Sequence, residues 1–319
     1  MNSLVIPVYR NAASIPALLD ALRKLARDVA DLEVVFVVDG SPDNSYAQLR
    51  EAAPALPFAT QLLALSRNFG SFAAIRSGLA AARGERFAVM AADLQEPPEL
   101  AAEFFERLTR DEADVLVGTR DGRSDPLGSR LGSALFWWLY RRLINAEIPA
   151  GGVDVFACNR AFRDELLKLE EQHSSLIGLI YWVGFRRGNV SYTRRVREHG
   201  KSAWTFKRKL KYMMDSVFAF SDLPIRMLLL AGIAGLIVAL LLGAVVVGLR
   251  LHGSADVPGY AATMITILFF GGLNAFGLGL LGAYLWRAFA NTQRRPLAIV
   301  MRGEVFSGTR VAASQEIGT

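Results

Sequence analysis

The chain has 319 residues, of which 52% are hydrophobic and 21% charged, and its formal net charge is +6. The apolar share is slightly above that of an average soluble protein and is concentrated late in the chain. A single cysteine, Cys158, excludes a disulfide and a cysteine-rich metal site, and the three scattered histidines give no zinc-ligand spacing. We expect Cys158 to be a buried thiol.

The first part of the chain alternates short apolar runs with amphipathic stretches. The apolar runs predict strands at residues 4–8, 32–38, 61–65, 87–92 and 114–118. The amphipathic stretches between them predict helices at residues 14–27, 44–52, 71–83 and 98–108. This βαβα rhythm predicts an α/β fold with a Rossmann-like, mostly parallel sheet and helices on both faces.

Two further helices are predicted before the apolar end of the chain. Residues 130–144 form an unusually aromatic helical stretch, for which packing against the sheet and contact with a membrane surface are equal alternatives. Residues 206–220 are amphipathic, with apolar side chains on one side and basic side chains on the other. We expect this second helix to lie in a membrane interface.

Two apolar stretches, residues 227–249 and 260–286, each exceed the roughly 20 residues that cross a bilayer. Two buried helices of a soluble protein are the alternative. Arg226 precedes the first stretch, and three arginines follow the second: Arg287, Arg294 and Arg295. The positive-inside rule therefore places both termini in the cytoplasm, with a short hairpin loop outside.

Much of the positive charge lies just before the first apolar stretch. Between Arg194 and Lys211 there are eight Lys or Arg residues and one acid, Glu198. A nucleic-acid-binding patch is an alternative, but a basic run beside a membrane span favours binding to anionic lipid or phosphate headgroups. We therefore expect a lipid bilayer, and no nucleic acid, among the partners. From Arg302 onward the chain is polar, and we expect a mobile tail.

Polar residues follow every strand of the predicted sheet. These clusters are Pro7–Tyr9, Asp39–Ser41, Arg67–Ser71, Asp93–Gln95 and Gly118–Arg120. Ligands of open α/β sheets bind beyond the carboxyl ends of the strands, so we expect one site there. Tyr9 could stack on a base, and Asp39 could accept from a base N–H or a ribose hydroxyl. Asp93 is suited to hold a divalent cation with attached phosphates, although a helix N-cap is the alternative for this residue alone.

At these clusters the chain resembles the inverting family 2 glycosyltransferases with the GT-A fold. It is most similar to those acting on polyprenyl phosphates, such as dolichol-phosphate mannose synthase and the bacterial undecaprenyl-phosphate sugar transferases. The motifs are Ile6-Pro-Val-Tyr9, Val38-Asp-Gly-Ser41, Arg67-Asn-x-Gly70, Asp93-Leu-Gln-x-Pro-Pro98, Gly118-x-Arg120, Arg130-x-x-Ser133, Arg197-x-x-Gly200-x-Ser202 and Ser221-x-x-Pro224.

The resemblance implies a domain organisation. It predicts a GT-A domain at residues 1–205, an amphipathic juxtamembrane helix at 206–223, a two-helix transmembrane hairpin within 224–290 and a cytoplasmic tail at 291–319. Glycines in the second span could support close helix packing within the chain or between chains of a homo-oligomer: Gly271, Gly272, Gly277, Gly279 and Gly282.

The resemblance also implies roles for individual residues. Asp93 and Gln95 would bind Mg²⁺ or Mn²⁺ that bridges the donor diphosphate. The nucleotide-binding residues would be Pro7, Tyr9, Asp39, Ser41 and Arg67. The donor and acceptor phosphates would be met by Arg120, Arg130, Ser133, Arg197 and Ser202, since an arginine fork grips phosphate oxygens bidentately. Asp154 stands where the family has an acidic residue near the acceptor, to orient it or to act as a base; a loop-capping carboxylate is the alternative.

Three positions depart from the pattern of the family. Ala91 stands at the first Asp of Asp-x-Asp-Leu-Gln, Val38 at the first Asp of Val-Asp-Asp-Gly-Ser, and Arg10-Asn11 replaces Asn-Glu. Mg²⁺ needs only one or two carboxylates when substrate phosphates and water complete its octahedron. Asp93 with Gln95 can therefore suffice, and Arg10 could offset part of the lost charge.

These observations predict an enzyme of the inner membrane that transfers a sugar, with inversion, from a nucleotide diphosphate sugar to a polyprenyl (undecaprenyl) phosphate for cell-envelope glycan synthesis. The acceptor phosphate is already anionic near neutral pH, so it needs no strong base. One alternative is transfer to a hydroxyl of a lipid-linked glycan. The other is a catalytically weakened scaffold that binds lipid-linked sugar.

Overall fold

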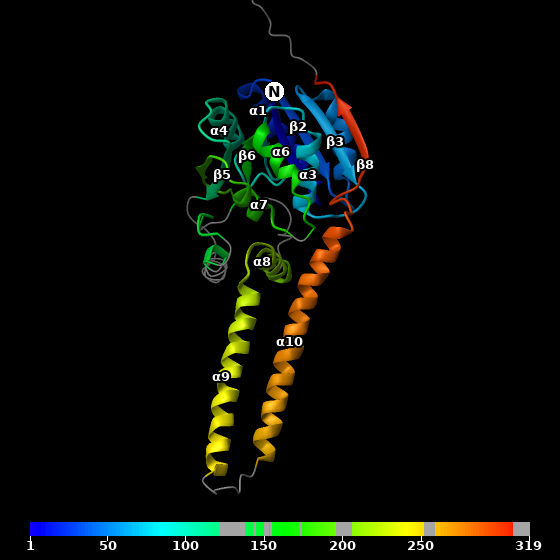
Figure 1. Cartoon of the computed structure of the whole chain (residues 1–319). Helices are drawn as coiled ribbons and strands as arrows, with labels where there is room; N and C mark the ends of the chain where they lie inside the picture. Colours follow the sequence, from blue (N-terminus) through cyan, green and yellow to red (C-terminus); the bar gives the residue numbers. More distant parts are fainter. Residues whose placement is uncertain are drawn as a thin grey trace, which may run out of the picture.

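The structure is a computed structural model that describes residues 1–120, 138, 140–142, 145–149, 153, 155–172, 174–195, 206–251 and 259–308. An α/β domain is built on an eight-stranded sheet. Two long helices extend away from this domain side by side, and an amphipathic helix lies where they meet it (Figure 1).

The sheet has the strand order β7-β5-β6-β4-β1-β2-β3-β8. Its four central strands are parallel: β1 (Asn2–Val8), β2 (Leu32–Val38), β3 (Ala59–Leu65) and β4 (Arg86–Val89). β5 (Val115–Arg120) and β7 (Arg187–Tyr192) run in the same direction. β6 (Phe156–Asn159) and β8 (Val300–Phe306) are antiparallel to their neighbours. The mostly parallel sheet confirms the predicted fold class.

Helices cover both faces of the sheet because its central strands are apolar on both sides. Leu4 and Ile6 of β1 pack in a core with α1 (Ile15–Asp28) and α4 (Pro98–Thr109). Val5, which points to the other face, packs with α3 (Ser71–Ala81) and two later helices, α6 (Arg160–Lys168) and α7 (Leu176–Val183). α2 (Ser45–Ala52) and the 3₁₀ turn η1 (Ala53–Ala55) connect β2 to β3. This double burial explains the near-continuous apolar runs of the sequence.

The order of the central strands positions the site. From β1 the chain moves outward through β2 to β3, then returns to place β4 on the other side of β1. Where the strand order reverses in this way, the connections leave a crevice at the carboxyl ends of the two adjacent strands. Tyr9 follows β1 and Asp93 follows β4, so both lie beyond the carboxyl ends of these two adjacent strands.

The second part of the chain contains α8 (Phe206–Phe220), α9 (Leu223–Leu251) and α10 (Tyr260–Thr292), and α8 has the bounds predicted from the sequence. Residues Leu223–Gly248 and Thr263–Thr292 are long and apolar enough to cross a membrane, with mean hydropathies of 2.8 and 1.9. Only 6% of each apolar window is buried inside the chain. Buried helices of a soluble protein are mostly covered, so this exposure disfavours that alternative.

The glycines of α10 differ in what surrounds them. A Cβ atom on Gly277 would lie 3.5 Å from Leu228 of α9, whereas one on Gly271, Gly272, Gly279 or Gly282 would meet no atom within 4 Å. Gly277 therefore faces α9. Packing of the other four against a second chain stays a prediction.

α8 is attached to both the domain and the hairpin. Its Tyr212 and Ser216 hydroxyls lie 3.3 and 3.1 Å from the Tyr140 hydroxyl, which is also 3.0 Å from Ser175 at the start of α7. Within the described part of residues 130–144, Tyr140 is fully buried whereas Trp138 is exposed, so both predicted alternatives for this stretch stay predictions.

The prediction of a mobile tail from Arg302 is wrong for residues 302–306, which belong to a strand. Residues 300–306 form β8, which pairs with β3 so that Glu304 lies opposite Leu62 and Val300 opposite Leu65. Glu304 also accepts hydrogen bonds from Tyr46 and, at 2.9 Å, from Arg50. The strand that follows the hairpin thus rejoins the domain that precedes it.

Candidate active site

The carboxyl ends of β1 to β5 and of β7 lie along one edge of the sheet, whereas β6 and β8 run in the opposite direction. This edge faces the hairpin. β8 begins at Val300, shortly after α10 ends at Thr292, and Val300 pairs with the last residue of β3, Leu65. The Ser66 N–H donates to the Ile299 carbonyl at 2.9 Å. The strand ends therefore lie on the side of the domain from which α10 emerges (Figure 1).

Asp39, at the end of β2, is tied to the loop that follows β3. Its side chain is buried, with Oδ1 accepting from the Phe69 N–H at 2.7 Å and Oδ2 from the Gly70 N–H at 2.9 Å. Burial raises the pKa of Asp39 above its ordinary value, although these two hydrogen bonds and the Arg67 guanidinium oppose the shift. Asp39 is thus a structural link, and each carboxylate oxygen keeps a lone pair for a ligand.

The glycine after Asp39 is required by the same contact between loops. Gly40 has φ +56°, and a Cβ atom there would lie 2.3 Å from the carbonyl carbon of Arg67. Only glycine allows the two backbones to approach this closely.

Ser41 and Asp43 connect the ends of β1 and β2. The Ser41 hydroxyl accepts from the Arg10 N–H at 2.8 Å and donates to Asp43 at 2.7 Å, and Asp43 also accepts from the Ala12 N–H at 3.0 Å. Burial alone would raise the pKa of Asp43, but hydrogen bonds from Ser41, Ser45 and Ala12 outweigh it and hold this pKa below its ordinary value. No role was predicted for Asp43 from the sequence, where its only signal was its position in the loop after Ser41.

Aromatic rings and cations accompany these carboxylates. The Arg10 guanidinium lies 5.4 Å from the centre of the Tyr9 ring, and that of Arg67 lies 4.0 Å from the Phe69 ring. Pro7 lies in β1, one residue before its end. We refer to the strand ends of β1, β2 and β3, with residues 9–12, 39–45 and 67–70, as the nucleotide corner. Nucleotide binding by Pro7, Tyr9, Asp39, Ser41 and Arg67 stays a prediction.

A second corner forms between the end of β4 and the end of β7. The Gln95 N–H donates to Asp93 Oδ1 at 3.3 Å, across Leu94, whose φ of +54° turns the chain sharply. The amide oxygen of Gln95 accepts from the Arg194 guanidinium, and its backbone carbonyl accepts from the Arg195 N–H at 2.8 Å. We refer to Asp93, Gln95 and Arg194 as the charge corner.

The charge corner fits a divalent cation that is shared with a ligand. Within the described part of the chain, no group of three or more His, Cys, Asp or Glu residues could hold a metal. Asp93 and the amide oxygen of Gln95 would supply two protein oxygens. Mg²⁺ accepts such a small set when phosphate oxygens and water complete its octahedron. These two oxygen ligands therefore suit a metal ion that is bound together with a diphosphate, rather than a metal ion held by the protein alone.

The remaining predicted residues divide into two groups. Arg120 is the last residue of β5, where it pairs in register with Tyr192 of β7, two residues before Arg194. Five residues lie outside the described part of the chain: Arg130, Ser133, Asp154, Arg197 and Ser202.

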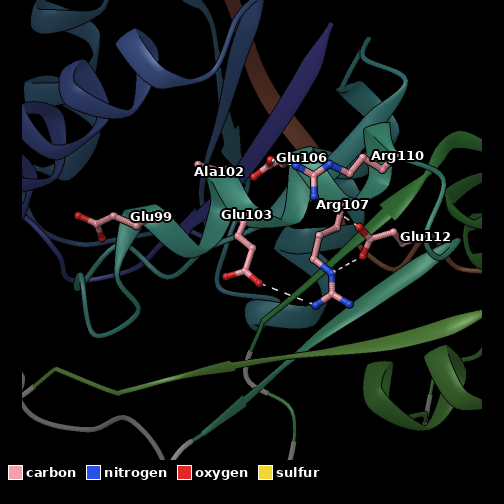
Figure 2. Close-up of a pocket in the computed structure, with 7 residues that line it drawn as sticks. All are labelled: Glu99, Ala102, Glu103, Glu106, Arg107, Arg110 and Glu112. Carbon is pink, nitrogen blue, oxygen red and sulfur yellow. Dashed lines mark hydrogen bonds and ion pairs between the residues drawn. The ribbon is translucent and has the colours of Figure 1, made fainter.

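Two surface hollows lie near α4. The hollow in Figure 2 is lined by α4 and the turn after it, and both of its arginines are paired with glutamates: Arg107 with Glu103 and Glu112, and Arg110 with Glu106. The other, of about 690 Å³, is bounded by the start of α4 and by residues 191–195, including Arg194. Only the second one borders the charge corner.

Comparison with known proteins gives a consistent result. Residues 3–169 match the family described as Glycosyl transferase family 2. The chain is 32% identical to an undecaprenyl-phosphate 4-deoxy-4-formamido-L-arabinose transferase of Pseudomonas paraeruginosa, over 94% of this chain and 89% of that protein. It is 30% identical to the uncharacterized glycosyltransferase YkcC of Bacillus subtilis, over 99% and 98%. It is 28% identical to a bactoprenol glucosyl transferase of Shigella phage SfV, over 93% and 97%.

Proposed function

Because the chain belongs to glycosyl transferase family 2, we propose that this glycosyltransferase moves a sugar from a nucleotide diphosphate sugar to a polyprenyl phosphate in the membrane. The observation that carries the proposal is the direction of the sheet, whose strand ends lie on the side from which α10 emerges. A site at this edge can meet a water-soluble donor and an acceptor whose phosphate lies at the membrane surface. Two relatives named for undecaprenyl phosphate and bactoprenol support the same acceptor class.

In this proposal α9 and α10 span the inner membrane and α8 lies in its cytoplasmic interface. β8 pairs with β3 of the domain at one end of the hairpin. This pairing supports placing the domain and β8 on the same side of the membrane. Arg226 lies at that end of α9, and Arg287, Arg294 and Arg295 lie at that end of α10. The positive-inside rule makes this side the cytoplasm.

The proposed reaction uses the two corners differently. The nucleotide corner would hold base and ribose, while Asp93 and Gln95 would hold Mg²⁺ or Mn²⁺ together with the donor diphosphate. The metal would neutralise charge on the departing diphosphate. Arg120 would bind phosphate oxygens at the end of β5. The same role is proposed for Arg130, Ser133, Arg197 and Ser202, and Asp154 would orient the acceptor.

The acceptor oxygen would attack the anomeric carbon from the face opposite the diphosphate. One C–O bond forms as the bond to the diphosphate breaks, so the configuration inverts. A phosphate monoester is largely dianionic near neutral pH, so no proton needs to be removed by the protein. A hydroxyl acceptor would need a base.

The test is a panel of nucleotide sugars incubated with the purified chain and undecaprenyl phosphate in membranes, with and without Mg²⁺ or Mn²⁺. We expect sugar transfer to the lipid phosphate from one donor. Transfer only to a hydroxyl of a lipid-linked glycan would contradict the proposed acceptor, and donor binding without transfer to either would favour a scaffold.

A further inference from the structure

The family motif Asp-x-Asp-Leu-Gln contains two aspartates. The charge corner has only the second, Asp93, and also contains a cationic side chain, Arg194. Ala91 stands two residues before Asp93, so residues 91–95 provide a single acid. From the other side, Arg194 reaches this segment from beyond the end of β7 and donates to the Gln95 amide oxygen. The corner is therefore more positive than a metal site built from two carboxylates.

Backbone contacts fix the place of Arg194. The Arg195 N–H donates to the Gln95 carbonyl at 2.8 Å, which joins the loop after β7 to the loop after β4. Tyr192, at the end of β7, pairs in register with Arg120 at the end of β5. Arg194 consequently lies at the same strand-end edge as Arg120 and Asp93, although it is distant from both in the sequence.

The Arg194 guanidinium retains unused capacity to bind an anion. It carries five N–H donors, and its contact with Gln95 uses Nη2, whereas its Nε is buried and has no partner among the described residues. Gln95 is neutral and cannot balance the positive charge. Among described residues no ion pair includes Arg194, and Glu99 pairs at 3.2 Å with Arg195 instead.

We propose that Arg194 is a diphosphate-binding residue, whose guanidinium holds the nucleoside diphosphate even when no divalent cation is bound. The inference rests on the proposed function, because it takes the donor to be a nucleotide diphosphate sugar. A guanidinium binds two phosphate oxygens at once, and its charge requires no deprotonation or metal uptake. In this arrangement Gln95 positions Arg194 in the absence of the diphosphate, and the metal adds to its charge rather than supplying all of it.

The experiment measures equilibrium binding of UDP, GDP, ADP and dTDP to the full chain in detergent, by calorimetry, in EDTA and in excess Mg²⁺. We expect one of these diphosphates to bind wild type in EDTA within about tenfold of its affinity in Mg²⁺. Arg194→Gln should lose about tenfold or more in EDTA, which corresponds to about 1.4 kcal/mol. Arg194→Lys should lose less, because it keeps the charge without the planar fork.

Arg195→Gln is the matched control, since its neighbour Arg195 is exposed and pairs with Glu99 at the surface. It should bind as wild type does. The inference is overturned if Arg194→Gln and Arg194→Lys, both folded by circular dichroism, bind as tightly as wild type in EDTA. It is also overturned if wild type binds only in Mg²⁺. If no nucleoside diphosphate binds in either condition, the proposed function itself fails.

Discussion

The two corners of the candidate site differ in what their carboxylates contact, since Asp39 and Asp43 reach other loops whereas Asp93 accepts from the backbone of its own loop. In the nucleotide corner, Asp39 and Asp43 accept hydrogen bonds from the backbone of neighbouring loops, so these acids build the site itself. In the charge corner, Asp93 and Arg194 approach Gln95 from two different strand ends. An acidic residue at a strand end can therefore hold neighbouring loops together as readily as it can bind a ligand. We expect substitutions in the nucleotide corner to reduce stability, and substitutions in the charge corner to reduce ligand binding and turnover.

The largest effect is expected for Asp93→Asn. Loss of the single carboxylate of the charge corner should reduce turnover by about 10²–10³-fold, the usual cost of removing one group that stabilises charge developing in a transition state. The melting temperature should change by less than about 3 °C. Sugar transfer and thermal unfolding measure the two quantities, with the exposed Asp20→Asn on α1 as control. Full activity in Asp93→Asn would remove the proposed role of Asp93.

Asp39→Ala should show the reverse pattern, with its main effect on stability. The partly buried N–H groups of Phe69 and Gly70 would lose their acceptors, and a donor left unpaired in a fully buried site costs about 1–3 kcal/mol. We expect the free energy of unfolding to fall by about 2–3 kcal/mol in urea titration. Unchanged stability, combined with lost nucleotide binding, would show that Asp39 acts as a ligand and not as a brace.

Breaking the ion pair between α8 and α10 should have an intermediate effect. Arg287 of α10 donates to Asp215 of α8 at 2.9 Å, and both side chains are about four-fifths buried. A double-mutant cycle with Asp215→Asn and Arg287→Gln should give a coupling energy of about 1 kcal/mol in thermal unfolding. The single variants should also raise the KM for the polyprenyl phosphate and leave nucleotide binding unchanged. A coupling energy near zero would show that the pair does not hold α8 to α10.

The smallest effect is expected in the pH dependence of stability. The pKa of Asp43 is lowered in the folded chain, so its contribution is present above the ordinary value of 3.8 and is lost as the pH falls through the lowered value. Asp43→Asn should therefore make the loss of stability below about pH 4 shallower.

The contribution of Asp39 to stability changes with pH in the opposite direction. Its pKa is raised, so its contribution is present below 3.8 and is lost as the pH rises through the raised value. Asp39→Asn should make the acid loss steeper. Equal slopes for the two variants in unfolding measured across this range would contradict the assigned shifts.

Much of the fold could be predicted from the sequence because β1 to β4 are apolar on both faces and alternate with amphipathic helices. β6, α6, α7 and β7 were missed in residues 156–192: β6 has four residues, and β7 reads Arg-Gly-Asn-Val-Ser-Tyr with little apolar pattern. β8 was missed because most of its side chains are exposed and its partner, β3, is distant in the sequence.

In the site, too, residues marked by a local sequence pattern could be predicted, and those placed by distant strand pairing could not. Asp93 and Gln95 could be predicted because an apolar run, residues 87–92, ends just before them. Arg194 was grouped with the basic run before the hairpin, since its proposed role depends on the pairing of β5 with β7, which no local pattern reveals. The rule that ligands meet strand ends would have selected Arg194 once β7 was recognised.

The most direct test of the account is the chemistry of the lipid product. After incubation with the cognate nucleotide sugar and undecaprenyl phosphate, mass spectrometry should show the lipid with one added sugar. Mild acid should then release that sugar and regenerate undecaprenyl phosphate, because the sugar is bound through its anomeric carbon to phosphate. An acid-stable sugar on a hydroxyl, with undecaprenyl phosphate unchanged, would contradict the proposed reaction.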